Sequence, residues 1–322
     1  MQLNQGTLMS EHAVAVVVER PMQLQLREVP LVAPTDNDLV VETCWSGIST
    51  GTEKLLYSGR MPIFPGMGYP LVPGYESVGR VVQAGRSTNY EIGEMVFVPG
   101  AACYGEVRGL FGGAASRVVI PALRALRISE SLGERGTLLA LAATAYHAFS
   151  APTSAQPELI VGHGVLGRMM ARIAVESGAK PVVWETNPAR RSGAVGYSVL
   201  DPEEDTRSNY RCICDVSGDP LILDQLIARA APNAEIVLAG FYDEPMSFSF
   251  PPAFMREVRI RVAAQWKPAE LIAVRDLVES RRLSLEGLIT HRSNPAQAEE
   301  AYRTAFNDPS CLKMILDWRQ SQ

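Results

Sequence analysis

The stretch Leu-Ile-Val-Gly-His-Gly-Val-Leu-Gly, residues 159–167, decides the fold of this 322-residue chain. It joins an apolar run of strand character to residues 165–178, where apolar side chains recur at helical spacing. The glycines have the spacing G-x-G-x-x-G, which between a strand and a helix predicts a dinucleotide site. Gly162 permits the tight turn, Gly164 lets a pyrophosphate approach the backbone, and Gly167 lets the helix pack on the sheet. The phosphates then bind the free N–H groups at the start of the helix.

The alternative is a glycine-rich turn that binds no ligand. The loop residues predicted to bind the cofactor are Gly162, His163, Gly164, Val165, Leu166 and Gly167.

The residue that distinguishes NAD from NADP is predicted at the end of the next strand, residues 181–185. Glu185 ends that strand, where a carboxylate accepts hydrogen bonds from both ribose hydroxyls of NAD and repels a 2′-phosphate. Arg190 and Arg191 follow; they favour NADP unless they lie on a solvated helix start. The sequence therefore predicts NAD as the cofactor, and NADP is the alternative. Two further predicted cofactor contacts are Arg190 and Gly240.

From about residue 134 onward, apolar strands alternate with helices. The predicted strands are 159–162, 181–185, 212–216, 235–240 and 258–264, and the predicted helices are 137–149, 165–178, 220–231 and 268–282. Such alternation predicts a parallel sheet covered on both faces, the doubly wound Rossmann arrangement of an α/β protein.

The chain before residue 134 is β-rich, with short strands separated by Gly and Pro turns. The predicted strands are 13–18, 22–29, 39–44, 78–84, 95–98 and 116–120, and residues 59–79 form a loop. The end, residues 288–318, reads strand, helix, strand. We therefore predict three parts: a disordered leader 1–12, a β-rich domain 13–133 with 284–322, and a Rossmann domain 134–283.

The composition is that of a globular enzyme with about two domains. The net charge of −5 gives no basic footprint for a nucleic-acid partner. The five cysteines are scattered without a C-x-x-C pair, which is typical of a reduced cytoplasmic protein. No apolar run is long enough to span a membrane, and the polar start lacks the apolar centre of a secretory signal. We expect a cytoplasmic protein without stable membrane insertion.

Several motifs besides the glycine loop carry a family resemblance. They are residues 47–53 (GISTGTE), 73–79 (PGYESVG), 92–96 (IGEMV), 144–146 (TAY), 215–218 (DVSG), 289–291 (ITH) and 312–316 (LKMIL). With them, nearly the whole chain resembles the medium-chain dehydrogenase/reductases. The resemblance implies a GroES-like catalytic domain beside the Rossmann domain, and contact of Thr144 with the nicotinamide. It also implies a homo-oligomer, joined through the edge strand 258–264.

The positions of the catalytic zinc ligands depart from the zinc-dependent members of that superfamily. Ser49 stands at about the cysteine position, allowing for one inserted residue, and Tyr75 replaces the histidine. The third position falls near Ala140. A site without its thiolate and imidazole does not hold catalytic zinc in the usual way, so we predict no metal.

A longer match, over residues 46–76 and 97–103, resembles the 3-hydroxyethyl bacteriochlorophyllide a dehydrogenases within that superfamily. This resemblance implies oxidation of the 3-(1-hydroxyethyl) group of a bacteriochlorophyllide, a Mg-chlorin or bacteriochlorin pigment, to 3-acetyl. NAD⁺ takes the hydride, and the reaction belongs to bacteriochlorophyll a biosynthesis. A location at the periphery of the photosynthetic membrane stays open.

Without a metal, hydrogen-bond donors and a base must handle the proton of the alcohol. The candidates are Ser49, Thr50, Tyr75 and His147. The alternative interpretation of Tyr75 is a packed aromatic side chain without a catalytic role. For His147 the alternative is a core histidine on an apolar helix. Ser49 and Thr50 are proton relays or bond only the local turn. Glu76 is expected to be structural, bonded to loop backbone.

The loop after residue 60 is rich in apolar side chains that suit a flat apolar ligand. The predicted substrate-binding residues are Met61, Phe64, Met67 and Tyr69; ordinary anchoring of the loop is the alternative. Lys54, Arg60 and Arg108 are candidate partners for a propionate of the pigment. Two rival functions stay open: a zinc-free NADPH-dependent quinone or enoyl reductase, and a dinucleotide-binding protein without catalysis.

Overall fold

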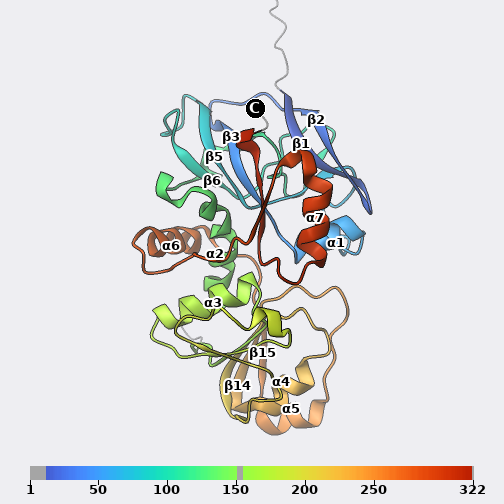
Figure 1. The fold of residues 1–322 in the computed structure, drawn as a ribbon, viewed down its shortest axis with the longest axis vertical. Helices are drawn as coiled ribbons and strands as arrows, with labels where there is room; N and C mark the ends of the chain where they lie inside the picture. Colours follow the sequence, from blue (N-terminus) through green and yellow to red (C-terminus); the bar gives the residue numbers. More distant parts are fainter. Residues whose placement is uncertain (1–11, 151–154, 321–322) are drawn as a thin grey trace, which may run out of the picture.

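The computed structural model describes residues 12–150 and 155–320. The predicted leader therefore lies outside the described residues, except that His12 already begins the first strand. Figure 1 shows two parts along the long axis of the molecule, a β-rich part above and an α/β part below. Within the described residues, no helix is long and apolar enough to cross a membrane.

The α/β part is built on a six-stranded sheet with the order β12-β11-β10-β13-β14-β15. Its strands are β10 (Leu159–Val161), β11 (Val182–Trp184), β12 (Ser198–Leu200), β13 (Tyr210–Asp215), β14 (Ala230–Leu238) and β15 (Arg259–Val262). All neighbouring pairs are parallel, as predicted. The chain leaves β10 toward β11 and returns to β13 on the other side, so a topological switch point lies beside β10. Ligands of such sheets bind in the crevice at the carboxyl ends of the strands at this point.

Helices α3, α4 and α5 follow the strands of this sheet (Figure 1). The helices of the described residues are α1 (Thr52–Ser58), α2 (Leu139–His147), α3 (Val165–Glu176), α4 (Leu223–Arg229), α5 (Phe250–Arg256), α6 (Pro268–Glu279) and α7 (Ala298–Asn307). In the same residues, 3₁₀ segments cover Ala122–Arg124, Glu130–Leu138, Pro188–Arg190, Pro295–Gln297 and Trp318–Gln320. The apolar helix α2 packs against both α3 and α6, between the two parts of the molecule.

The β-rich part contains two sheets, with the orders β2-β1-β4-β7 and β16-β17-β3-β5-β6-β9; β8 pairs with β3. Its strands are β1 (His12–Arg20), β2 (Gln23–Pro30), β3 (Asp38–Ile48), β4 (Leu71–Val72), β5 (Ser77–Ala84), β6 (Met95–Val98), β7 (Arg108–Gly109), β8 (Arg117–Pro121), β9 (Leu126–Arg127), β16 (His291–Ser293) and β17 (Met314–Asp317). The end of the chain returns here, because β17 pairs antiparallel with the end of β3.

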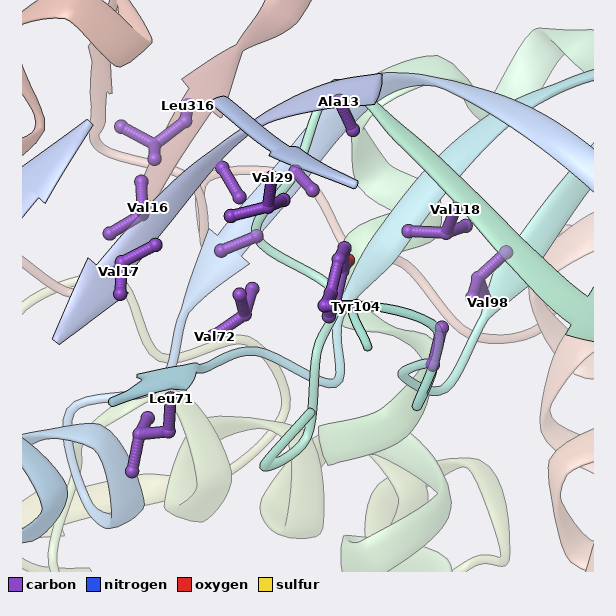
Figure 2. Packing of buried hydrophobic residues seen from close by; sticks show 14 of the residues in the cluster. Ala13, Val16, Val17, Val29, Leu71, Val72, Val98, Tyr104, Val118 and Leu316 are labelled. Carbon is purple, nitrogen blue, oxygen red and sulfur yellow. The ribbon is translucent and has the colours of Figure 1, made fainter. Parts of the chain in front are cut away.

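The core of the β-rich part lies between the two sheets. Figure 2 shows Val16 and Val17 of β1, Leu71 of β4, Val118 of β8 and Leu316 of β17 in this cluster. Apolar residues either alternate with polar ones along these strands or form continuous runs. The elements that bury them come from both ends of the chain.

A second core cluster connects the two parts of the molecule. It includes Trp45, Val78 and Phe97 from the β-rich sheets, together with Ile160 and Met169 from β10 and α3. The two parts therefore share buried apolar side chains, and their relative position is held by packing as well as by the covalent connections.

Candidate active site

A cavity of about 1380 Å³ lies between the two parts and draws its walls from both. The carboxyl ends of the parallel strands form one wall, with Gly162 after β10, Glu185 after β11 and Gly240 after β14. The turn from β3 into α1, Tyr75, Phe111 and the segment before β17 form the facing wall. The glycine loop and the predicted hydroxyl residues therefore face one space, although they are far apart in the sequence.

The glycine loop has the geometry that the motif predicts. Gly162 has a φ of +101°, a left-handed value that favours glycine. A Cβ on Gly167 would lie 1.9 Å from the carbonyl oxygen of Gly162, so helix α3 can approach the turn only because that residue is glycine. A Cβ on Gly164 would meet no atom within 4 Å, and Gly164 lines the cavity. The N-terminus of α3 has no side-chain cap, so its first N–H groups are available to an anion.

The carboxylate of Glu185 is fixed at the edge of this loop. Its two oxygens accept the backbone N–H groups of His163, at 3.0 Å, and of Asn187, at 2.8 Å. Each carboxylate oxygen can accept more than one hydrogen bond, so both keep capacity for ribose hydroxyls. The side chain lines the cavity at the position predicted for discrimination between NAD and NADP.

His163 belongs to the glycine loop at the cavity, but its imidazole is buried and hydrogen-bonded to neighbouring protein groups. Nδ1 lies 2.6 Å from the carbonyl oxygen of Arg190, and Nε2 lies 2.8 Å from the hydroxyl of Tyr197. Burial lowers the pKa of His163 to about 4, so the ring is neutral. Because a carbonyl only accepts, Nδ1 carries the proton and Nε2 accepts from Tyr197. The ring thus attaches the segment after β11 to the glycine loop.

The two arginines after Glu185 have different environments. Arg190 lines the cavity, and its Nε donates to the carbonyl oxygen of Pro309 in the facing part, at 2.8 Å. Arg191 instead donates to the carbonyl oxygen of Glu185, at 2.8 Å, and pairs with Asp201. The guanidinium of Arg191 is therefore held against its own strand connection.

The hydroxyl candidates meet at the facing wall. Tyr75 Oη shares a hydrogen bond with Ser49 Oγ and lies 3.4 Å from Thr52 Oγ1. The ring of Phe111 contacts the ring of Tyr75 edge-on, with centroids 5.4 Å apart. Burial, reinforced by the charge of Glu76, raises the pKa of Tyr75. The phenol therefore stays neutral and acts as a hydrogen-bond donor. Ser49, Thr50, Thr52 and Tyr75 all line the cavity.

Two buried carboxyl groups, Glu53 and Glu76, lie next to the hydroxyl cluster on the side away from the cavity. Glu53 accepts the N–H of Ser49 at 2.9 Å and the hydroxyl of Tyr302 at 2.6 Å, and burial raises its pKa to about 7. Glu76 lies 2.5 Å from Nζ of Lys313, which also donates to the carbonyl of Ile48 at 3.1 Å. Glu76 is buried, but its carboxylate bonds Lys313, the residue before β17, and not the predicted loop backbone.

The residues at the zinc-ligand positions do not fit a zinc ion. Ser49 and Tyr75 offer neutral hydroxyls already bonded to each other, and the fully buried Ala140 offers only a methyl group. Zinc sites use thiolate, imidazole or carboxylate donors. Across residues 12–150 and 155–320, no group of three or more His, Cys, Asp or Glu side chains is placed to hold a metal. We therefore derive no step through a metal ion.

Three predicted site residues lie outside the cavity lining. His147 has its Nδ1 2.9 Å from both carboxylate oxygens of Glu270, in the contact between α2 and α6. The hydroxyl of Tyr69 donates to the carbonyl of Leu56, and Met67 packs on the core of the β-rich part. The structure does not bring these side chains to the hydroxyl cluster, and the roles predicted for them stay predictions.

The other predicted contacts do line the cavity. They are Met61, Phe64, Thr144, Val165, Leu166, Arg190 and Gly240. Thr144 donates its hydroxyl to the carbonyl of Ala140, at 3.0 Å. Sequence reasoning missed Phe111, Arg124, Trp266 and Lys313, which also line it. Glu53 was marked only by its place in the 47–53 motif.

Comparison with known proteins agrees with this architecture. Residues 35–130 match the model of the alcohol dehydrogenase GroES-like domain. A short chain alcohol dehydrogenase from E. coli CFT073, solved with NADH, superposes with a TM-score of 0.81 at 22% identity, covering 96% of this chain and 100% of that one. Acetophenone reductase from Geotrichum candidum, solved with NAD, gives 0.81 at 19% identity over 97% and 98%. These neighbours bind a dinucleotide, and at this identity they show the fold: a GroES-like domain with a Rossmann domain, as predicted.

Two relatives are far more similar in sequence. The 2-desacetyl-2-hydroxyethyl bacteriochlorophyllide A dehydrogenase of Rhodobacter capsulatus is 57% identical over 95% of this chain and 98% of its own. The protein of the same name from Cereibacter sphaeroides is 55% identical over the same shares. Likeness of this degree over both full lengths, on the fold and cavity described above, places the chain in a family. It belongs to the 2-desacetyl-2-hydroxyethyl bacteriochlorophyllide A dehydrogenases of the medium-chain dehydrogenase/reductase superfamily.

Proposed function

We propose that this protein oxidises the hydroxyethyl group of a bacteriochlorophyllide to an acetyl group, with NAD⁺ as hydride acceptor, in bacteriochlorophyll a biosynthesis. The group is at position 3 in the numbering used above and at position 2 in the name of the relatives. One observation carries the proposal: a single cavity joins the glycine loop to a cluster of three hydroxyls. The family relatives named above supply the substrate class.

The glycine loop, the start of α3 and Glu185 would hold the dinucleotide, which supplies the acceptor for the hydride. The protein itself must bind the alcohol oxygen and remove its proton. Tyr75 is neutral, so its Oη can accept the alcohol proton while the phenol proton moves to Ser49 Oγ or Thr52 Oγ1. The phenol is then neutral again and donates a hydrogen bond to the substrate oxygen, which stabilises the negative charge that develops there. With NAD⁺ bound, the hydride of the alcohol carbon would have its acceptor, and the hydroxyl cluster would release the alcohol proton to water.

The direct test mixes the purified protein with NAD⁺ and the hydroxyethyl pigment. We expect NADH absorbance to rise in step with formation of the acetyl pigment. Oxidation of NADPH by a quinone in place of this reaction would instead identify the reductase alternative. Dinucleotide binding without turnover of either substrate would identify the non-catalytic alternative.

The choice of NAD over NADP rests on Glu185. Glu185→Gln keeps the size of the side chain but removes its charge, whereas Glu185→Ala removes the ribose contact as well. We expect Glu185→Ala to weaken NAD binding by roughly 10- to 100-fold, from two lost charge-assisted hydrogen bonds. Both variants should bind NADP more tightly than the wild type does, because the repulsion of the 2′-phosphate is gone. Titration calorimetry with both cofactors measures this, and an unchanged NAD/NADP ratio would contradict the role of Glu185.

We further propose that two copies of the chain join through β15. This strand ends the sheet order and pairs only with β14 within the described chain. Val262 on β15 is 73% exposed and Ile260 is 37% exposed. Phe250, Phe254 and Met255 of the neighbouring α5 are also exposed. An exposed apolar edge strand is a pairing surface, and a second copy across a twofold axis would extend the sheet.

A charge on this edge is expected to separate the copies. Val262→Lys should change the mass in solution from twice the 35.0 kDa of one chain to that of a single chain. Light scattering during gel filtration measures the mass. Val195→Lys is the matched control, because Val195 is similarly exposed, at 68%, but lies away from β15. A wild-type protein that is already monomeric at micromolar concentration would refute the proposal.

A further inference from the structure

Arg124 introduces a positive charge into the cavity from the β-rich part. It ends the 3₁₀ segment Ala122–Arg124, after β8. It lines the cavity together with Pro99 and Phe111, on the wall that also carries Tyr75. Neither composition nor any motif distinguished it from the other surface cations of the chain.

The strand order of the sheet places Arg124 relative to the hydroxyl cluster. Arg124 lies two residues before β9, where Leu126 pairs with Phe97 of β6, and Pro99 follows the end of β6. Val98 of β6 pairs with Ser77 of β5, two residues after Tyr75. β9 and β5 are therefore two strand spacings apart, roughly 10 Å, with Arg124 just before β9 and Tyr75 just before β5.

The other cations of the cavity already have partners. Lys54 Nζ donates to the carbonyl of Phe306 at 3.2 Å, and Lys313 pairs with the buried Glu76. Arg190 donates to Pro309 across the cleft, as described above. For Arg124, the described part of the chain provides no ion pair and no hydrogen bond to the guanidinium. Its charge is thus available to a ligand that occupies the cavity.

We propose that Arg124 binds the propionate carboxylate of the pigment and thereby selects the free acid over its esters; this rests on the function proposed above. A bacteriochlorophyllide is the unesterified form of its pigment, so it carries a carboxylate on the same rigid macrocycle as the reacting hydroxyethyl group, at the end of a short propionate chain. The planar guanidinium fork matches a carboxylate in a bidentate pair. Phe111 and Pro99 beside it offer apolar surface to the macrocycle between the two polar ends.

The test compares two substrates that differ only at the propionate: the hydroxyethyl bacteriochlorophyllide and its methyl ester. For the wild type we expect a KM for the acid that is roughly two- to fivefold lower than for the ester, the upper range of an exposed ion pair. Arg124→Gln should raise the KM for the acid to that for the ester and leave kcat and the KM for the ester unchanged. Arg124→Lys should keep part of the preference, because it retains the charge without the fork.

Two controls separate the possible outcomes. Arg86→Gln removes an exposed cation of the same part that does not line the cavity, so the preference for the acid should persist. If Lys54→Gln abolishes the preference and Arg124→Gln does not, the assignment to Arg124 is wrong. Equal KM values for acid and ester in the wild type also overturn it, while leaving the proposed function intact. Failure of the wild type to oxidise either pigment instead refutes the proposed function.

Discussion

Replacing Tyr75 by phenylalanine is expected to lower kcat by about 10²–10³-fold, the cost of losing one donor to a developing oxyanion. The ring would still pack against Phe111, so the fold should be kept. The hydroxyl of Ser49 would lose its partner and would face the substrate oxygen without the phenol between them. The KM for the pigment should change little, because the interaction strengthens in the transition state rather than in the ground state.

Steady-state kinetics of Tyr75→Phe, with Tyr69→Phe as the matched control, would test this role. The hydroxyl of Tyr69 bonds a backbone carbonyl outside the cavity, so its loss should leave kcat near the wild-type value. A Tyr75→Phe enzyme with wild-type kcat would refute proton handling by the phenol. Loss of activity in both variants would indicate a general effect of removing buried hydroxyls from this part of the molecule.

A second large effect is expected at the glycine loop. One alanine substitution there should lower the stability of the protein, and another should weaken NAD binding without lowering stability. In Gly167→Ala the new methyl group would lie 1.9 Å from the carbonyl oxygen of Gly162, so the turn and α3 must move apart. We expect a loss of about 3 kcal/mol or more of unfolding free energy, since overpacking against backbone exceeds the gain in helix propensity of about 1 kcal/mol. Denaturant unfolding measures this loss.

In Gly164→Ala the methyl group meets no protein atom within 4 Å, and a φ of −72° is accessible to alanine. The unfolding free energy should therefore stay within about 0.5 kcal/mol of the wild-type value. The methyl group does occupy space that a pyrophosphate needs, so we expect NAD to bind at least roughly tenfold more weakly. Unchanged NAD affinity in Gly164→Ala would show that the pyrophosphate does not lie over this residue.

The parts of the site that the sequence predicted are those determined locally. The glycine loop needs only nine consecutive residues, 159–167, and their flanking strand and helix. Glu185 was predicted because the second strand of a Rossmann unit ends at a known interval after the loop. Ser49 and Tyr75 were predicted through motif positions, and the structure joins their hydroxyls.

The parts that were missed depend on contacts between distant segments. Lys313 reaches Glu76 over 237 positions of sequence, and no local pattern at either residue indicates the pair. His147 has helical spacing, but Glu270 on α6 decides which way its ring faces. Arg124 lines the cavity beside β9, which pairs with β6, and no motif at Arg124 indicates that pairing. The missed strands β4, β7, β9 and β12 have two or three residues each, too few to show alternation.

The core cluster that includes both Trp45 and Met169 also bears on how the protein loses its structure. Separation of the two parts would expose apolar side chains of both to water at once. If one part unfolds, the other therefore loses the contacts that bury its own apolar side chains. The domain boundary that the sequence suggests is therefore not a thermodynamic boundary. Heat or denaturant should unfold the chain in one cooperative transition. A fragment ending near residue 133 would expose to solvent the apolar side chains that the other part buries.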